Sequence, residues 1–75
     1  METKYEQEYI KFGLKVQYYR KLKGMTQEAF AEKVGISWAH VARIEGPSHA
    51  HGVSMETLFA MADVLEIPVS KLFEE

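Results

Sequence analysis

The strongest constraint on the fold is the stretch of residues 26–45, in which two short amphipathic segments are separated by a single glycine. In the first segment, Phe30, Ala31 and Val34 recur at helical spacing. They follow Thr26, whose hydroxyl is suited to accept hydrogen bonds from the first N–H groups of a helix. Gly35 then ends that helix. The pattern predicts two short helices joined by a tight turn.

The second segment opens at Ser37, a second candidate N-cap, and has two distinct faces. Val41 and Ile44 fall on its inner side. Its outer side carries Trp38, Ala39, Ala42 and Arg43. Two helices joined by a short turn containing glycine are typical of a helix-turn-helix, whose second helix can lie in the major groove of DNA. The pattern therefore predicts a recognition helix over residues 37–45.

Before this pair, the chain predicts one long helix from about Tyr5 to Leu22. Gly13 is its only helix breaker, and we expect it to be tolerated at a cost of about 1 kcal/mol. Gly24 supplies the C-terminal stop. The apolar stripe expected to face the core consists of Phe12, Val16 and Tyr19, extended backwards by Tyr5 and Tyr9.

After the pair, a loop leads to a helix from Ser54 to about Leu65 and to a last short helix from Val69 to about Phe73. The side chains expected on the core are Leu58, Ala62 and Leu65, with Met55 and Met61 beside them, and then Leu72 and Phe73. The predicted fold class is all-α, a compact five-helix domain with a central helix-turn-helix. We expect a single domain over residues 1–75, in which residues 1–12 extend the first helix.

The three helix starts at Thr26, Ser37 and Ser54 share one local signal. In each, an apolar residue precedes the cap and another occupies the fourth position inside the helix, which is the pattern of a hydrophobic staple. The starts of these helices are therefore predicted from local chemistry.

Composition excludes several classes of protein. The 75 residues include no cysteine, which excludes a disulfide framework and thiolate metal sites and fits a reducing compartment. No apolar run approaches the length that spans a membrane, and the N-terminus is too acidic for a signal peptide. We therefore expect a soluble, cytoplasmic protein that is not an enzyme, because no catalytic constellation rises above chance.

The distribution of charge is more informative than its total. The formal net charge of −2 argues against a nucleic-acid partner. Residues 11–45, however, carry seven Lys or Arg against three Glu. This places the positive charge on the helix pair and on the helix before it, which favours a nucleic-acid partner. The alternative interpretation is that these charges form an ordinary solvated face.

Apolar, glycine and capping positions agree with a known pattern over residues 13–73. They are Arg20, Gly24, Thr26-Gln27-Glu28, Ala31-Glu32, Val34-Gly35-Ile36-Ser37, Val41, Arg43-Ile44-Glu45-Gly46, Ser54, Leu58, Ala62, Leu65 and Leu72. In these positions the chain resembles the lambda-repressor and Cro-like helix-turn-helix domains of phage repressors and bacterial regulators. The resemblance implies a sequence-specific regulator of transcription, expected to be a repressor that occupies a double-stranded DNA operator as a homodimer, without a cofactor.

The resemblance also implies which residues meet the bases. They are Trp38, Ala39, Ala42 and Arg43. A guanidinium can donate two hydrogen bonds to guanine, which gives Arg43 the clearest role. Trp38 could press on a thymine methyl, or it could pack on its own domain or on a protein partner. The two alanines offer only methyl groups, so DNA shape is expected to contribute to specificity.

A second set of residues is expected to contact the DNA phosphates, although for each of its lysines a merely solvated charge is the alternative interpretation. It consists of Thr26, Gln27, Ser37, His40, Lys15, Lys33 and His49. Thr26 and Gln27 begin a helix, where free N–H groups favour an anion. Arg20 and Glu45 resemble the family's internal ion pair and are expected to be structural.

The histidines of the loop leave one question open. His49 and His51 are two residues apart, but nothing nearby completes a metal site, and no metal is expected. We expect His49, and His51 as a second candidate, to approach the DNA backbone when protonated, which would tighten binding below neutral pH.

The alternative function is a protein-interaction module on the same scaffold, such as an antitoxin or anti-repressor.

Overall fold

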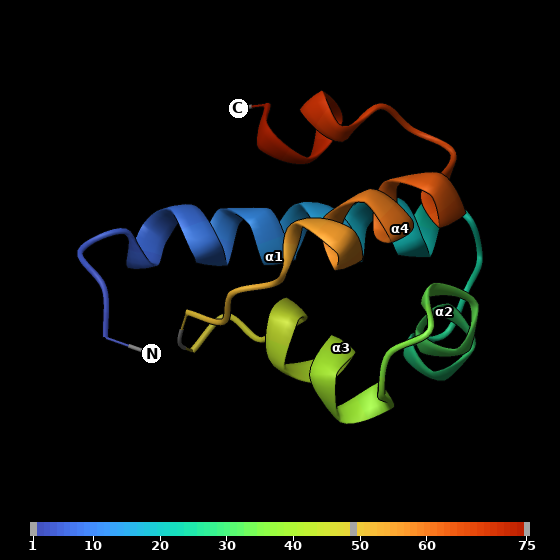
Figure 1. The fold of residues 1–75 in the computed structure, drawn as a ribbon, viewed down its shortest axis with the longest axis horizontal. Coiled ribbons are helices and arrows are strands. Elements are labelled where there is room, and N and C mark those ends of the chain that lie inside the picture. Colours follow the sequence, from blue (N-terminus) through green and yellow to red (C-terminus); the bar gives the residue numbers. More distant parts are fainter. Residues whose placement is uncertain (1, 49, 75) are drawn as a thin grey trace.

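The computed structural model describes residues 2–48 and 50–74, which form four α-helices and one 3-10 helix and contain no strand (Figure 1). The elements are α1 (Glu6–Leu22), α2 (Gln27–Val34), α3 (Trp38–Glu45), α4 (Met55–Leu65) and the 3-10 helix η1 (Val69–Phe73). The all-helical fold class is confirmed. The last short helix expected from Val69 is a 3-10 helix, in which the N–H of Lys71 donates to the carbonyl of Pro68, three residues back (3.0 Å), so the count is four α-helices rather than five.

The helix starts predicted from local chemistry are confirmed. The hydroxyl of Thr26 accepts a hydrogen bond from the N–H of Ala29 at 3.0 Å, and that of Ser37 accepts one from His40 at 3.0 Å. Ser54 caps α4 in the same way. Between α2 and α3, Gly35 has a φ of +90°, so the turn uses the left-handed conformation that glycine adopts readily. These local features fix how α3 follows α2.

The core lies where α1 and α4 meet α2, α3 and η1, and it contains most of the predicted apolar positions. Its buried side chains are Phe12, Val16, Phe30, Ala31, Val41, Ile44, Leu58, Met61, Ala62, Leu65 and Leu72. Figure 1 shows η1 on one side of α1 and α3 on the other. In the part of the chain described, no helix has the length and the apolar character needed to cross a membrane.

Three residues predicted to face the core are largely exposed instead. Met55 is 63% exposed because it stands at the open N-terminal end of α4, one turn before the buried stripe begins at Leu58. Phe73 is 59% exposed, and its ring stacks on Phe12 from outside, with 5.4 Å between centroids. Tyr5 is 54% exposed because it precedes the first turn of α1.

α1 runs through Gly13 without a break, as expected, and the structure gives this glycine a packing role that the sequence did not indicate. Gly13 is buried where α1 crosses α3, and a β-carbon at this position would stand 1.9 Å from the carbonyl oxygen of Ile44. No side chain can be accommodated at that distance, so the crossing requires glycine. The absence of a side chain at Gly13 sets how closely α3 is held against α1.

Candidate nucleic-acid interface

The outer side of α3 is open to solvent along its length. Trp38 is 55% exposed, and Ala39, Ala42 and Arg43 are also exposed. We call these four residues the reading face. The opposite side of the same helix is buried at Val41, Ile44 and Glu45, which anchor it to the core. The helix therefore presents a continuous surface to a partner while its inner side is fixed.

Trp38 is attached to the domain through its one polar atom. Its indole N–H donates to Oε1 of Gln27 at 3.2 Å, and Nε2 of Gln27 donates to Oε1 of Glu45 at 3.0 Å. An indole only donates and an ionised carboxylate only accepts, so one orientation of the Gln27 amide satisfies both partners. Gln27 begins α2 and Trp38 begins α3, so this bond fixes the two helix starts relative to each other.

The chain of hydrogen bonds continues into the core through a buried ion pair. Arg20 donates from Nε to Oε2 of Glu45 at 2.7 Å and from Nη2 to Oε1 at 2.9 Å. Its Nη1 donates to the carbonyl of Met25 at 2.7 Å. Arg20 and Glu45 are 6% and 2% exposed, so each charge depends on the other for compensation. α1 is thus connected to the reading face through three side chains.

Three of the residues expected to contact phosphate, Thr26, Gln27 and Ser37, lie at the starts of α2 and α3. Thr26 and Ser37 are exposed, and their hydroxyls accept the capping hydrogen bonds of α2 and α3. His40 is half-buried, and its ring meets that of His51 edge to face, with 5.1 Å between centroids. Lys33 is exposed in the last turn of α2. The expectations for His49 fall on a residue outside those that the structure describes.

Comparison with known proteins identifies the family. The profile described as Helix-turn-helix matches residues 16–46. The N-terminal DNA-binding domain of SinR from Bacillus subtilis is 30% identical, with a TM-score of 0.76 over 85% of this chain and 91% of that one. The chain belongs to the lambda-repressor and Cro-like helix-turn-helix family.

A further solved structure shares this helix-turn-helix fold. The restriction-modification controller protein C.AhdI from Aeromonas hydrophila is 28% identical, with a TM-score of 0.81 over 89% of this chain and 98% of that one. No curated protein sequence gives a significant match. The proteins found in these comparisons are regulators of transcription and not enzymes.

Lys15 is not brought together with the other residues expected to contact phosphate. It lies about 200° around α1 from Gly13, which faces α3. It lines a small hollow with Leu72, Phe73 and Glu74 of the C-terminal segment. Lys15 therefore stands on the side of this helix-turn-helix domain turned towards η1, away from the reading face.

The positive charge of residues 11–45 is also less concentrated than the sequence suggested. Arg20 is neutralised by Glu45, and Lys23, the C-cap residue of α1, forms a hydrogen-bonded ion pair with Glu66. That hydrogen bond and the charge of Lys23 lower the pKa of Glu66 below its usual value. Of the cations in this range, Lys33 and Arg43 are the two that belong to α2 and α3.

Within the described residues, no three His, Cys, Asp or Glu side chains come together as metal ligands.

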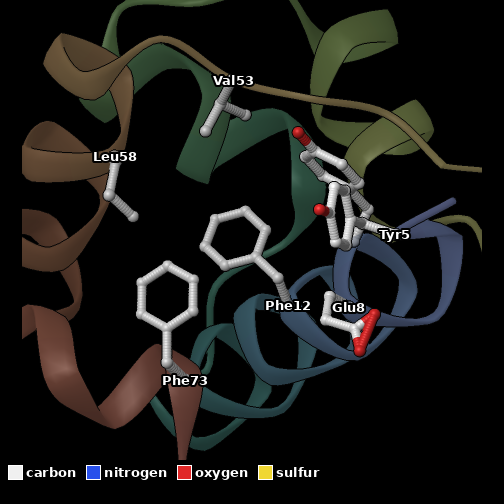
Figure 2. Close-up of a pocket in the computed structure, with 7 residues that line it drawn as sticks. Tyr5, Glu8, Phe12, Val53, Leu58 and Phe73 are labelled. Atoms are coloured by element: carbon white, nitrogen blue, oxygen red, sulfur yellow. The ribbon is translucent and has the colours of Figure 1, made fainter. Parts of the chain in front are cut away.

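A second surface lies apart from the helix-turn-helix. An open hollow of about 340 Å³, which we call the aromatic hollow, lies at this surface. Figure 2 shows the side chains that line it. Its walls are Tyr5, Glu8, Tyr9, Phe12, Val53, Leu58 and Phe73. None of these residues belongs to α2 or α3. The aromatic hollow is therefore available to a partner independently of the reading face.

Proposed function

We propose that this protein is a sequence-specific transcription regulator that lays α3 in the major groove of double-stranded DNA. The observation that carries the proposal is the reading face itself, a row of exposed side chains on a helix whose other side is buried. The family supports it, as does the fact that the related SinR was solved in complex with DNA. In this role Arg43 pairs with a guanine and its neighbours contact adjacent bases.

Phosphate contacts orient the domain in this proposal. Thr26, Gln27, Ser37 and His40 flank the reading face, and the first turns of α2 and α3 add backbone N–H groups and the positive ends of their helix dipoles. Lys33 supplies a further positive charge at the end of α2. Such contacts hold the helix in register on the duplex without reading its sequence.

We further propose that the regulator is a homodimeric repressor that acts by occupying a two-fold operator. We place the dimer interface at the aromatic hollow, which the N-terminal segment lines with Tyr5 and Tyr9 and the terminal 3-10 helix lines with Phe73. A dimer joined there presents one α3 to each half-site. Sedimentation over a concentration series tests this. Phe73→Asp should shift the protein towards monomer, whereas Phe59→Asp on α4 should not, and a wild-type protein monomeric throughout would contradict it.

The alternative remains a protein-interaction module, and two observations favour it. The net charge is −2, and Trp38 is half exposed beside two alanines, as in a surface that binds protein. Selection of bound sequences from a random DNA pool separates the two functions. A regulator should enrich a palindromic motif and lose affinity steeply as salt rises, because phosphate binding releases counterions. Failure to enrich any motif would favour the protein partner.

A further inference from the structure

Trp38 has no hydrogen-bonding group left for a base. The N–H of an indole is its only one, and in Trp38 it donates to Gln27 while 55% of the side chain stays exposed. What the residue presents to a partner is therefore carbon. This distinguishes it from the amide or hydroxyl side chains that pair with base edges.

Gln27 is not free to turn and release that N–H. Its amide nitrogen donates to Oε1 of Glu45, and this oxygen also accepts from Nη2 of Arg20. Turning the amide by 180° would set its oxygen against the carboxylate and its nitrogen against the indole N–H, which mismatches both contacts. The hydrogen bonds that run from the buried ion pair through Gln27 thus fix the position of the Trp38 indole.

The centre of the reading face is apolar as well. Ala39 and Ala42 are exposed, and Ala42 lies one turn after Trp38 on the same side of α3. Their methyl groups continue the carbon surface of the indole. Among the four residues of the reading face, Arg43 supplies the further hydrogen-bond donors through its guanidinium. Around α3, the two alanines lie between Arg43 and Trp38.

In the major groove, an apolar surface finds one matching group on a standard base pair, the 5-methyl group of thymine. We propose that the reading face recognises its half-site through thymine 5-methyl groups packed against Trp38, Ala39 and Ala42, beside a guanine held by Arg43. This inference rests on the DNA-binding function proposed above and names the feature of the DNA that is read. Hydrogen bonds to thymine edges play no part in it.

Replacing thymine by deoxyuracil tests the inference, because it removes the methyl group and keeps every hydrogen-bonding atom of the base. The operator is first selected from a random pool, and each thymine of a half-site is then replaced singly. Affinity is measured by fluorescence anisotropy at one salt concentration. We expect a loss of roughly fourfold for each methyl in contact. Replacing a thymine outside the selected motif should leave affinity unchanged.

Variants of Trp38 separate the ring from its N–H. Trp38→Ala should abolish the loss caused by deoxyuracil at one position of each half-site, because the surface that contacted the methyl is gone. Trp38→Phe keeps an apolar ring without the N–H, so the loss should persist. The matched control is Phe59→Ala, which removes an aromatic side chain of similar exposure from α4. Thermal melting of each variant verifies that it is folded.

The outcomes distinguish this inference from the function on which it rests. A pool that yields no motif, with no salt-dependent binding, overturns the proposed function and the inference together. A motif without thymines, or equal affinity for thymine and deoxyuracil operators, overturns the methyl readout and leaves DNA binding intact. Loss of uracil discrimination in Trp38→Phe as complete as in Trp38→Ala overturns it too, since an apolar ring at this position would then not be what reads the methyl group.

Discussion

The Cα of Gly13 lies so close to the main chain of α3 that a β-carbon would meet the carbonyl oxygen of Ile44 at 1.9 Å. The contact is with backbone, so no rotation of a side chain can relieve it. Ile44 is buried on the inner side of α3, directly before Glu45 of the ion pair. The position of the candidate recognition helix therefore depends on a residue 31 places earlier in the chain.

Gly13→Ala should destabilise the protein, although the same change in an exposed helix would stabilise it by about 1 kcal/mol. Forcing a methyl group against the α3 backbone is expected to cost about 1–3 kcal/mol. In a domain of this size, each kcal/mol lowers the melting temperature by roughly 4–8 °C. Thermal unfolding followed by circular dichroism measures the effect. A variant that melts higher than the wild type would show that α1 and α3 can separate freely.

Breaking the ion pair of Arg20 and Glu45 should destabilise the protein more than Gly13→Ala does, and replacing both partners should restore much of the stability. Glu45→Ala leaves the Arg20 guanidinium buried without compensation and should cost about 3–5 kcal/mol, lowering both melting temperature and DNA affinity. Replacing both residues, as in Arg20→Met with Glu45→Leu, removes the charge and should recover much of the stability. Urea unfolding measures each variant. A double variant no more stable than Glu45→Ala would mean that the hydrogen bonds to Gln27 and Met25 matter more than charge compensation.

The pair between Lys23 and Glu66 predicts a weak pH dependence. Because the Lys23 ammonium lowers the pKa of Glu66 in the folded protein, this carboxylate contributes stability at pH values above the ordinary pKa of a glutamate. That contribution is lost as the pH falls through the lower folded pKa. Glu66→Gln should therefore melt slightly below the wild type at pH 7 and approach it under more acidic conditions. Because both groups are exposed, high salt should reduce the difference at pH 7, and a difference that grew on acidification would contradict the assignment.

Arg43 should determine one position of the operator. Arg43→Ala removes a contact that discriminates guanine by about 1–3 kcal/mol, so selection with this variant should relax the preference at that position and leave the others. Lys33→Ala is the matched control, because loss of a phosphate contact weakens binding to all sequences alike and reduces the slope of affinity against salt by about 1. An unchanged motif with Arg43→Ala would exclude its role in base reading.

Local chemistry made the helices predictable. Thr26, Ser37 and Ser54 cap their own helices, and the signal lies within a few residues of each start. The buried stripes of α1 and α4 follow in the same way from helical periodicity, since the spacing of Val16 or Leu65 relative to their neighbours is visible in the sequence. The exposed side of α3 was expected for the same reason.

The contacts between helices were harder to predict. The bonds from Gln27 to Trp38 and Glu45 join residues 11 and 18 places apart, and only the docking of α2 on α3 brings them together. Gly13 has no side chain whose pattern could indicate a contact. The sequence therefore indicated only its cost to helix formation and not its packing against α3. Lys15 was assigned to the DNA side by its charge, which says nothing about where α1 turns it.

DNA binding by the reading face of α3 is tested by a gel shift on the selected operator, with the wild type compared with Arg43→Glu. Arg43 is exposed, so the substitution should leave the melting temperature nearly unchanged while it sets a carboxylate against the acceptors of guanine and the phosphates. The wild type should give a salt-dependent shift that is abolished in Arg43→Glu. Equal shifts for the two proteins would contradict it.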